Sequence, residues 1–119
     1  MLPAAHRMRR SVDFSAAVRG RRASAPTLVL HVRSRREGAE PARMGLIVSK
    51  AVGNAVVRNR VARRLRAVCA AEISTWEAGD LVVVRALPAA GAASSAALAS
   101  DLHQAAARVG LAGEAGTRP

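Results

Sequence analysis

The residues that could do chemistry in this chain are concentrated in one basic stretch, residues 50 to 66, KAVGNAVVRNRVARRLR. The stretch holds five arginines, one lysine and two asparagines, and it contains no acidic residue. Apolar residues recur at the spacing of one buried helix face, and they are Val57, Val61, Leu65 and Val68. The arginines fall on the other sides of the same helix. A helix with one apolar side and a crowded cationic side needs a polyanion to neutralise it, and nucleic acid is the obvious candidate.

Composition places the chain among folded domains with a strong positive charge. It has 119 residues, of which 19 are basic and 8 are acidic, giving a formal net charge of +11. Half of the residues are hydrophobic, so the chain can bury one modest core and is not a disordered basic tail. A polyanionic partner would relieve the self-repulsion of this charge, whereas a merely soluble, highly charged protein is the plainer alternative.

Patterns typical of catalysis or metal binding are not found in the sequence. His6, His31 and His103 are far apart and lack the spacing of metal ligands. The acidic residues are scattered, and no two are spaced for paired acid and base catalysis. We therefore expect no catalytic residue, no metal site and no cofactor bound by the chain itself.

The start of the basic helix is a place where a phosphate could bind without catalysis. The phrase VGNAV resembles a glycine loop before a helix, but it lacks the full nucleotide-binding patterns. Asn54 is a good N-cap, and the free N–H groups of a helix N-terminus attract anions. Ser49 and Lys50 lie beside it in the sequence.

The cysteine count and the apolar pattern bear on the cellular compartment. Cys69 is the only cysteine, so no internal disulfide can form, and we expect it to be a small core residue. No run of 18 apolar residues exists, so no membrane span is expected. The N-terminus also lacks the apolar core of a secretory signal, and a cytoplasmic setting is the default.

Hydrophobic periodicity and turn residues predict an α+β domain with one small sheet carrying helices. The expected elements are a helix over 11–19, a strand over 27–33, a hairpin loop over 34–42, a strand over 43–49, a helix over 54–74, a strand over 81–86, a loop over 88–93 and a helix from Ser94 or Ser95 to Val109. Arg21 and Arg22 are placed in a loop. The long helix joins the second and third strands, for which a right-handed crossover is the default.

Aromatic residues that could stack on bases are few, since the chain has only Phe14 and Trp76. The sheet with several stacking aromatics that is typical of one large RNA-binding class is therefore not expected. Phe14 could stack on one base, or anchor the first helix to the sheet, or do both at the edge of a groove. His31 could contact a base or be a half-buried strand residue. Trp76 is interpreted as a packing residue.

At KAVGNAVVRNRVARRLR the sequence resembles the signature of the bacterial ribonuclease P protein subunit family. In that family a strand ending in Val-Ser-Lys leads through a Val-Gly-Asn turn into a helix with an Arg-Asn-Arg core. The matching residues here are Val48, Ser49, Lys50, Val52, Gly53, Asn54, Arg58, Asn59 and Arg60, with Arg63, Arg64 and Arg66 following. RMRRSVDFSAAV, LVLHV and GDLVVVRALPAA also look like family elements, so the resemblance covers about residues 7 to 109.

The resemblance implies a division of labour between protein and RNA. A catalytic RNA with bound Mg²⁺ would hydrolyse a phosphodiester bond in precursor tRNA, releasing the 5′ leader and leaving the mature 5′ end. This chain would be the accessory subunit, a monomer in a 1:1 complex with the RNA, with no DNA or membrane partner. The implied fold is like the second domain of ribosomal protein S5, in the order α-β-β-(β)-α-β-α with a left-handed β-α-β crossover.

The resemblance also implies two sets of contacts and three segments. The RNA-binding residues would be Ser49, Lys50, Asn54, Arg58, Asn59, Arg60, Arg63, Arg64 and Arg66. The cleft for the single-stranded leader would be lined by Phe14, His31, Arg9 and Arg10. The segments would be a basic N-terminal segment over 1–10, an RNA-binding domain over 11–109 and a flexible tail over 110–119.

Two departures from the family pattern concern the leader cleft. Family members often carry a second aromatic residue where this chain has Val18, and a tyrosine where it has His31. The resemblance therefore implies that leader binding depends more on charge here.

Three other functions remain as alternatives. The chain could be a structural RNA-binding protein of the ribosomal type, with the fold and charge but no processing role. It could be a DNA-binding regulator, which would need a neighbouring helix across a tight turn. An independent nuclease is disfavoured by the scattered acids and histidines.

Overall fold

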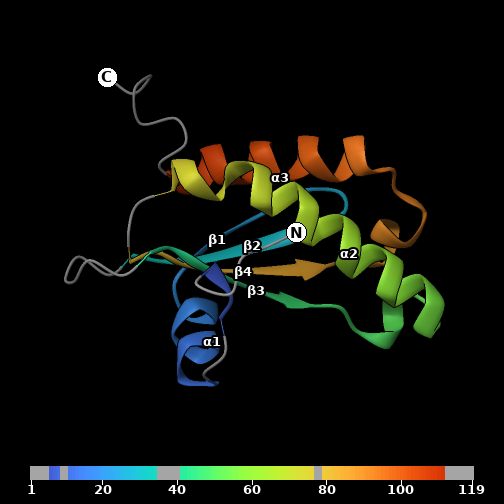
Figure 1. The fold of residues 1–119 in the computed structure, drawn as a ribbon, viewed down its shortest axis with the longest axis horizontal. Helices are drawn as coiled ribbons and strands as arrows, with labels where there is room; N and C mark the ends of the chain where they lie inside the picture. The colour runs from blue at the N-terminus through green and yellow to red at the C-terminus, as the bar shows by residue number, and fades with distance from the viewer. Residues whose placement is uncertain (1–5, 9–10, 35–40, 77–78, 112–119) are drawn as a thin grey trace.

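The computed structural model describes residues 6–8, 11–34, 41–76 and 79–111. They form a four-stranded sheet with helices on both faces (Figure 1). The helices and strands, in chain order, are α1 (Ser11–Val18), β1 (Arg21–Ser24), β2 (Leu28–Arg33), β3 (Arg43–Ile47), α2 (Ala55–Glu72), β4 (Leu81–Ala86) and α3 (Ser95–Val109). Short 3₁₀ helices are η2 (Lys50–Val52), η3 (Ile73–Thr75) and η4 (Pro88–Ala92). The α+β class and the expected helices are confirmed.

The sheet has the strand order β1-β2-β4-β3. β4 pairs antiparallel with β2 on one side and parallel with β3 on the other. The prediction of a hairpin between the strands over 27–33 and 43–49 is therefore wrong, because β4 lies between them. The first four residues of β4, LVVV, are apolar and fully buried. A strand of this kind is most stable at the centre of a sheet, where it has a partner strand on each edge.

The edge strand β1 was missed because its sequence, RRAS, shows no apolar alternation. The structure pairs Arg21 to Ser24 with Val32 to Val29 of β2, so the prediction of a loop at Arg21 and Arg22 is wrong. Exposed charged residues are common on edge strands, where they oppose pairing with another chain. A charged edge strand such as β1 therefore has a sequence that cannot be distinguished from that of a loop.

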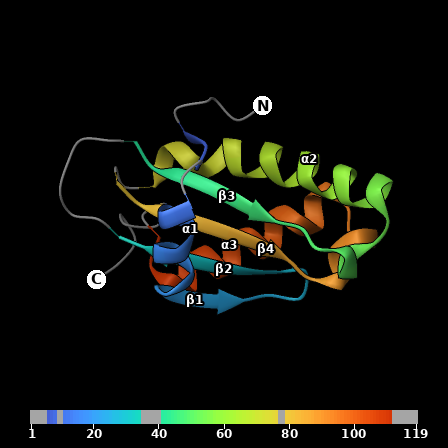
Figure 2. The same ribbon diagram turned by 90° about the horizontal axis from the view of Figure 1, so that it is seen from below.

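The crossover from β3 through α2 to β4 is left-handed. β3 and β4 are parallel neighbours, and α2 packs on the face of the sheet opposite to α1 (Figures 1 and 2). The right-handed default is wrong here, and the handedness implied by the family resemblance is confirmed. Sequence periodicity carries no information about this choice, since both hands bury the same helix face.

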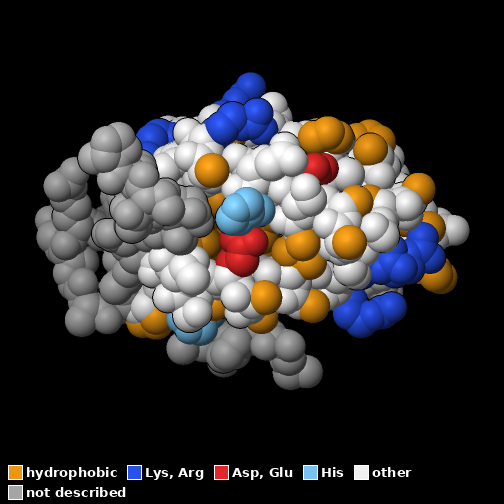
Figure 3. All heavy atoms as spheres, turned by 90° about the horizontal axis from the view of Figure 1, so that it is seen from above, with side chains coloured by type: hydrophobic (Ala, Val, Ile, Leu, Met, Phe, Trp, Pro, Cys, Tyr) orange, Lys and Arg blue, Asp and Glu red, His pale blue; other side chains and the backbone are white. Residues whose placement is uncertain are grey.

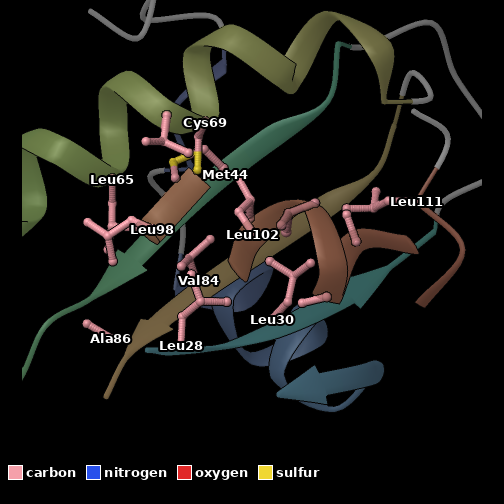
Figure 4. Packing of buried hydrophobic residues seen from close by; sticks show 14 of the residues in the cluster. Leu28, Leu30, Met44, Leu65, Cys69, Val84, Ala86, Leu98, Leu102 and Leu111 are labelled. Atoms are coloured by element: carbon pink, nitrogen blue, oxygen red, sulfur yellow. The ribbon is translucent and has the colours of Figure 1, made fainter. Parts of the chain in front are cut away.

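The main core lies between the sheet and the two long helices (Figure 4). Leu65 and Cys69 of α2 and Leu98 of α3 are completely buried there, over β2 and β4. Cys69 is thus the small core residue that we expected, and burial raises the pKa of its thiol strongly. Trp76 is also buried in this core, as predicted for a packing residue.

The C-terminal end of α3 is fixed by a hydrogen-bonded cap. Gly110 has a left-handed conformation (φ 74°), its N–H donates to the Ala107 carbonyl at 3.2 Å, and the Leu111 N–H donates to the Ala106 carbonyl at 2.9 Å. This is the Schellman arrangement, completed by the burial of Leu111 in the core. Gly110 and Leu111 are therefore part of the domain and not of a flexible tail, while residues 112–119 lie outside the described residues.

A buried carboxylate ties α3 to the loop before β2. The Asp101 carboxylate accepts hydrogen bonds from the Thr27 backbone N–H at 3.0 Å and from the Thr27 hydroxyl at 2.6 Å. Both residues are buried, so the carboxylate satisfies two donors that would otherwise lack partners.

None of the helices in the described part of the chain is long and apolar enough to cross a membrane.

Candidate nucleic-acid interface

Two side-chain caps shape the entry into the basic helix. The Ser49 hydroxyl accepts a hydrogen bond from the Ala51 N–H at 3.3 Å at the start of η2, and Asn54 Oδ1 accepts from the Val57 N–H at 3.0 Å at the start of α2. Gly53 between them has φ 154°, and a Cβ there would lie 2.8 Å from Val57 Cγ1. The Asn54 N-cap is thus confirmed, and the Val-Gly-Asn sequence is explained by a turn that only glycine fits.

Three arginines of α2 donate hydrogen bonds to backbone carbonyls of the protein itself. Arg58 Nε donates to the Gly53 carbonyl at 3.3 Å. A guanidinium N–H of Arg60 donates to the Gly91 carbonyl at 3.1 Å, and one of Arg64 donates to the Ala93 carbonyl at 2.7 Å. All three side chains are half-buried. Arg60 and Arg64 therefore fasten α2 to the segment that joins β4 to α3, whatever else they contact.

The other predicted RNA-binding residues of this region are exposed and are Ser49, Lys50, Asn54, Asn59, Arg63 and Arg66. Within the described part of the chain, no hydrogen bond or ion pair involves the side chains of Lys50, Arg63 or Arg66. These three cations are available to a polyanion. On the surface that carries α2 and α3, Lys and Arg side chains lie towards the edges and not over the centre (Figure 3). The cationic flank of α2 is the exposed side that carries Arg63 and Arg66, three residues apart, and Arg66 lies beside β3.

A pocket of about 210 Å³ connects this flank of α2 with α1 and the edge strand β3. The described residues that line it are Arg7, Met8, Phe14, Met44, Gly45, Leu46 and Arg66. Phe14 and Arg66 thus come together from elements far apart in the sequence. An aromatic ring and a guanidinium beside one pocket suit a single-stranded nucleic acid, which offers both bases for stacking and phosphates for ion pairing.

Gly45 provides the space that the Phe14 ring occupies. A Cβ built on Gly45 would lie 2.3 Å from Phe14 Cζ, well inside van der Waals contact. The half-buried Phe14 packs with α1 residues against Leu81 and Val83. Both functions considered for Phe14 from the sequence, an anchor for α1 and a ring at a groove, are therefore compatible with its position.

We expect Gly45→Ala to displace the Phe14 ring and weaken binding of a single-stranded RNA several-fold, since one stacked base is worth about 1–3 kcal/mol. The measurement is fluorescence anisotropy with a short labelled oligoribonucleotide. Urea unfolding of the Gly45→Ala variant is the control, because it shows whether the variant is folded under the binding conditions. If Gly45→Ala binds the RNA like the unmodified protein, Phe14 does not contribute to the interface.

His31 is placed differently from Phe14. It lies in a row of directly paired residues, Arg22, His31, Val83 and Gly45, whose side chains share the face of the sheet that carries α1. Its side chain is only 3% exposed and does not line the Phe14 pocket as described. Burial, and then the charges of Arg85 and Arg22, lower its pKa, against a smaller opposing effect of the Val18 backbone.

The remaining residues predicted for the leader cleft, Arg9 and Arg10, lie outside the described residues. Next to them in sequence, Arg7 and Met8 run along β3: Arg7 forms a parallel bridge with Met44, and the Met8 N–H donates to the Met44 carbonyl at 2.9 Å. Arg7 and Met8 are therefore extended along β3 and belong to the domain. The described residues contain no group of three or more His, Cys, Asp or Glu side chains that could hold a metal ion.

Comparisons with known proteins agree with the motif around α2. A model of the family described as Ribonuclease P matches residues 2–110. The ribonuclease P protein component of Streptomyces bikiniensis is 54% identical over 113 residues, covering 88% of this chain and 92% of that protein. The corresponding protein of Nocardioides sp. is 49% identical and covers 92% of this chain and 96% of that protein. This chain belongs to the ribonuclease P protein family.

Solved structures of ribonuclease P proteins share the fold. The Staphylococcus aureus protein superposes with a TM-score of 0.78 at 22% identity, covering 90% of this chain and 97% of that one. The Thermotoga maritima protein, solved with 1-(4-fluorophenyl)-2-thiourea, gives a TM-score of 0.70 at 19% identity and covers 82% of this chain and 94% of that one. These structures confirm the fold, while the family model and the relatives confirm the family resemblance seen in the sequence.

Sequence reasoning missed several residues that the structure places near the candidate interface of this ribonuclease P family member. Gly45 was interpreted only as part of a strand, although a glycine within a strand often marks a close approach of another group. Arg7 was grouped with a basic segment and not with the pocket. Arg85 was read as part of a buried strand, and a charge inside an otherwise apolar run is a signal that this face of β4 is partly open.

Proposed function

We propose that this chain is the protein subunit of ribonuclease P that binds the catalytic RNA and the 5′ leader of precursor tRNA, and so assists removal of the leader. The observation that carries the proposal is the pocket where Phe14 of α1 meets Arg66 of α2 beside β3. It joins the cationic flank of α2 to a surface suited to an unpaired strand. Membership of the ribonuclease P family supplies the reaction.

In this proposal the two parts of the interface have different tasks. Exposed cations along α2 and its entry, including Lys50 and Arg63, neutralise phosphates of the catalytic RNA. Phe14 stacks on a leader base, while Arg66 pairs with a phosphate of the same strand. Contacts to phosphates and to base faces carry little sequence information, which suits a subunit that must accept many leaders.

Catalysis belongs to the RNA in this proposal. The bound Mg²⁺ ions act with the RNA subunit, and the protein raises affinity for the substrate. The protein acts as a monomer in a 1:1 complex with the RNA in the cytoplasm.

Reconstitution with the catalytic RNA tests the function. The purified protein should accelerate cleavage of precursor tRNA at low Mg²⁺ concentration, and it should stimulate cleavage much less when the 5′ leader of the substrate is shortened to one nucleotide. The protein alone should not cut precursor tRNA with any metal ion. Cleavage that copurifies with the polypeptide would overturn the accessory role.

The second candidate is a structural RNA-binding protein without a processing role, which the cationic flank of α2 would also serve. Absence of stimulation in the reconstituted reaction, with RNA binding retained, would favour it.

A DNA-binding regulator is not supported, because α2 is connected to β3 through η2 and to β4 through η3. A recognition helix of the helix-turn-helix kind has another helix across a tight turn.

A further inference from the structure

Two connections that leave the same end of the sheet pack against each other. β3 and β4 are parallel neighbours, so the chain leaves both strands at one end of the sheet, through η2 before α2 and through η4 before α3. η4 lies beside η2 and the start of α2 (Figures 1 and 2). Val52 of η2 and Ala90 of η4 are both buried in the main core. The two connections therefore form one packed unit, although they are far apart in the sequence.

Gly91 allows the backbones of the two connections to approach closely. A Cβ at Gly91 would lie 2.7 Å from the Val52 carbonyl oxygen and 3.4 Å from Val57 Cγ1. The first distance is shorter than van der Waals contact, so any side chain at this position would push η4 away from η2. Gly91 does not have a positive φ. The packing of η4 on η2, and not an unusual backbone angle, therefore requires glycine here.

Arg60 and Arg64 hold η4 from the side of α2. The Arg60 guanidinium donates to the Gly91 carbonyl at 3.1 Å, and the Arg64 guanidinium donates to the Ala93 carbonyl at 2.7 Å. The two arginines are four residues apart, so they lie on one side of the helix. They meet the C-terminal end of η4, where carbonyl groups lack partners within the helix and accept hydrogen bonds from basic side chains. Both guanidinium groups thus have a partner within the protein.

The turn that η4 supports presents Lys50 to solvent. The Gly53 N–H donates to the Lys50 carbonyl at 3.1 Å, and the Val52 N–H donates to the Ser49 carbonyl at 3.1 Å. The Lys50 side chain is exposed and makes no hydrogen bond or ion pair within the described residues. The backbone of η2 therefore sets the direction in which Lys50 leaves the protein, and the position of η2 depends on its contact with Gly91.

We propose that Arg60 and Gly91 are positioning residues for binding of the catalytic RNA, and that they act through Lys50. Arg60 holds η4 against η2, and the missing side chain of Gly91 lets the two connections meet, so the turn is fixed before the RNA binds. A turn that is already ordered loses less conformational freedom on binding, which raises affinity without a further contact. The proposal rests on the proposed function, in which Lys50 neutralises a phosphate. It gives Arg60 a different task from the RNA contact that the family resemblance implies.

A double-mutant cycle with Lys50 tests this arrangement, because it measures whether two residues act through one another. Affinity for the catalytic RNA is measured for Gly91→Ala, for Lys50→Gln and for the variant with both changes. Gly91→Ala alters no charge, and it should weaken binding about fivefold in the unmodified background but less than about twofold in the Lys50→Gln background. Arg60→Gln should show the same coupling to Lys50→Gln.

Arg63→Gln is the matched comparison, since it removes the charge of an exposed arginine from the same helix. As a direct contact to a phosphate, Arg63 should contribute the same factor, within about twofold, whether or not Lys50 is replaced. Equal losses from Gly91→Ala in the two backgrounds would overturn the proposal. Equal losses from Arg60→Gln in the two backgrounds would also overturn it, because Arg60 would then be a direct contact.

The free protein gives a second readout that needs no RNA. The backbone amide signals of Ser49 to Gly53 in nitrogen–proton NMR spectra should shift in Gly91→Ala and in Arg60→Gln, and they should stay in place in Arg63→Gln. Urea unfolding shows that each variant is folded, and Arg60→Gln carries the cycle alone if Gly91→Ala does not fold. Unmoved amide signals in the folded variants would show that neither residue positions the turn.

Cleavage of precursor tRNA with the catalytic RNA tests the proposed function separately. Failure of the unmodified protein to stimulate cleavage would reject that function, while the amide signals would still decide whether Arg60 and Gly91 fix the turn. Stimulation by the unmodified protein together with uncoupled losses in the cycle would keep the function and reject the positioning role.

Discussion

Replacing Arg63 and Arg66 with alanine is expected to lower the slope of log affinity against log salt by about 1.5 for binding to the catalytic RNA. Each neutralised phosphate contributes roughly 0.7 to 0.9 to this slope, because binding releases a condensed counterion. Both side chains are exposed and unpaired within the described residues, so their removal costs the protein no internal hydrogen bond or ion pair. Affinity measured at several salt concentrations between about 50 and 200 mM checks the slope directly.

Arg60→Ala with Arg64→Ala is the matched comparison, because it removes the same charge from the same helix. These two side chains donate to the Gly91 and Ala93 carbonyls, so their loss should also lower the free energy of unfolding by about 1 kcal/mol each. Urea denaturation separates the two pairs, since the Arg63 and Arg66 variant should unfold like the unmodified protein. An unchanged salt slope in the Arg63 and Arg66 variant would remove this flank of α2 from the interface.

Leu65→Ala is expected to lower the free energy of unfolding by about 3 kcal/mol, within the range of 2–5 kcal/mol for deletion of a buried leucine side chain. Leu65 is completely buried between α2 and the sheet, in the core shown in Figure 4. The loss is large for a domain whose total stability is of the order of 5–15 kcal/mol. Urea unfolding followed by circular dichroism gives the value.

Val56→Ala on the same helix is the control for this change. Its side chain is 71% exposed, so deletion of its methyl groups should alter stability by less than about 0.5 kcal/mol. A cost below about 1 kcal/mol for Leu65→Ala would mean that α2 does not pack on the sheet as described. RNA binding by the folded fraction should be retained, because Leu65 does not reach the cationic flank.

The local features of this protein could be predicted because they depend on neighbours in the sequence. The Asn54 cap, the buried face that includes Val61 and Leu65, and the apolar strand at 81–86 were each found from periodicity and capping residues. The charge of +11 and the arginines of α2 indicated a nucleic-acid partner in the same way. Caps, helix faces and net charge are set within a few residues or by composition alone.

The pairing of distant segments was decided by the tertiary structure. Insertion of β4 between β2 and β3, the left hand of the crossover and the pairing of the charged strand β1 depend on contacts between segments tens of residues apart. The same contacts place Phe14 beside Arg66, tie Arg60 to Gly91 and bury His31 opposite Arg22 of β1. Several strand orders bury the same apolar faces, so the hydrophobic pattern alone cannot choose among them. The tertiary structure selects the order in which the apolar faces are buried and the central strands are hydrogen-bonded on both edges.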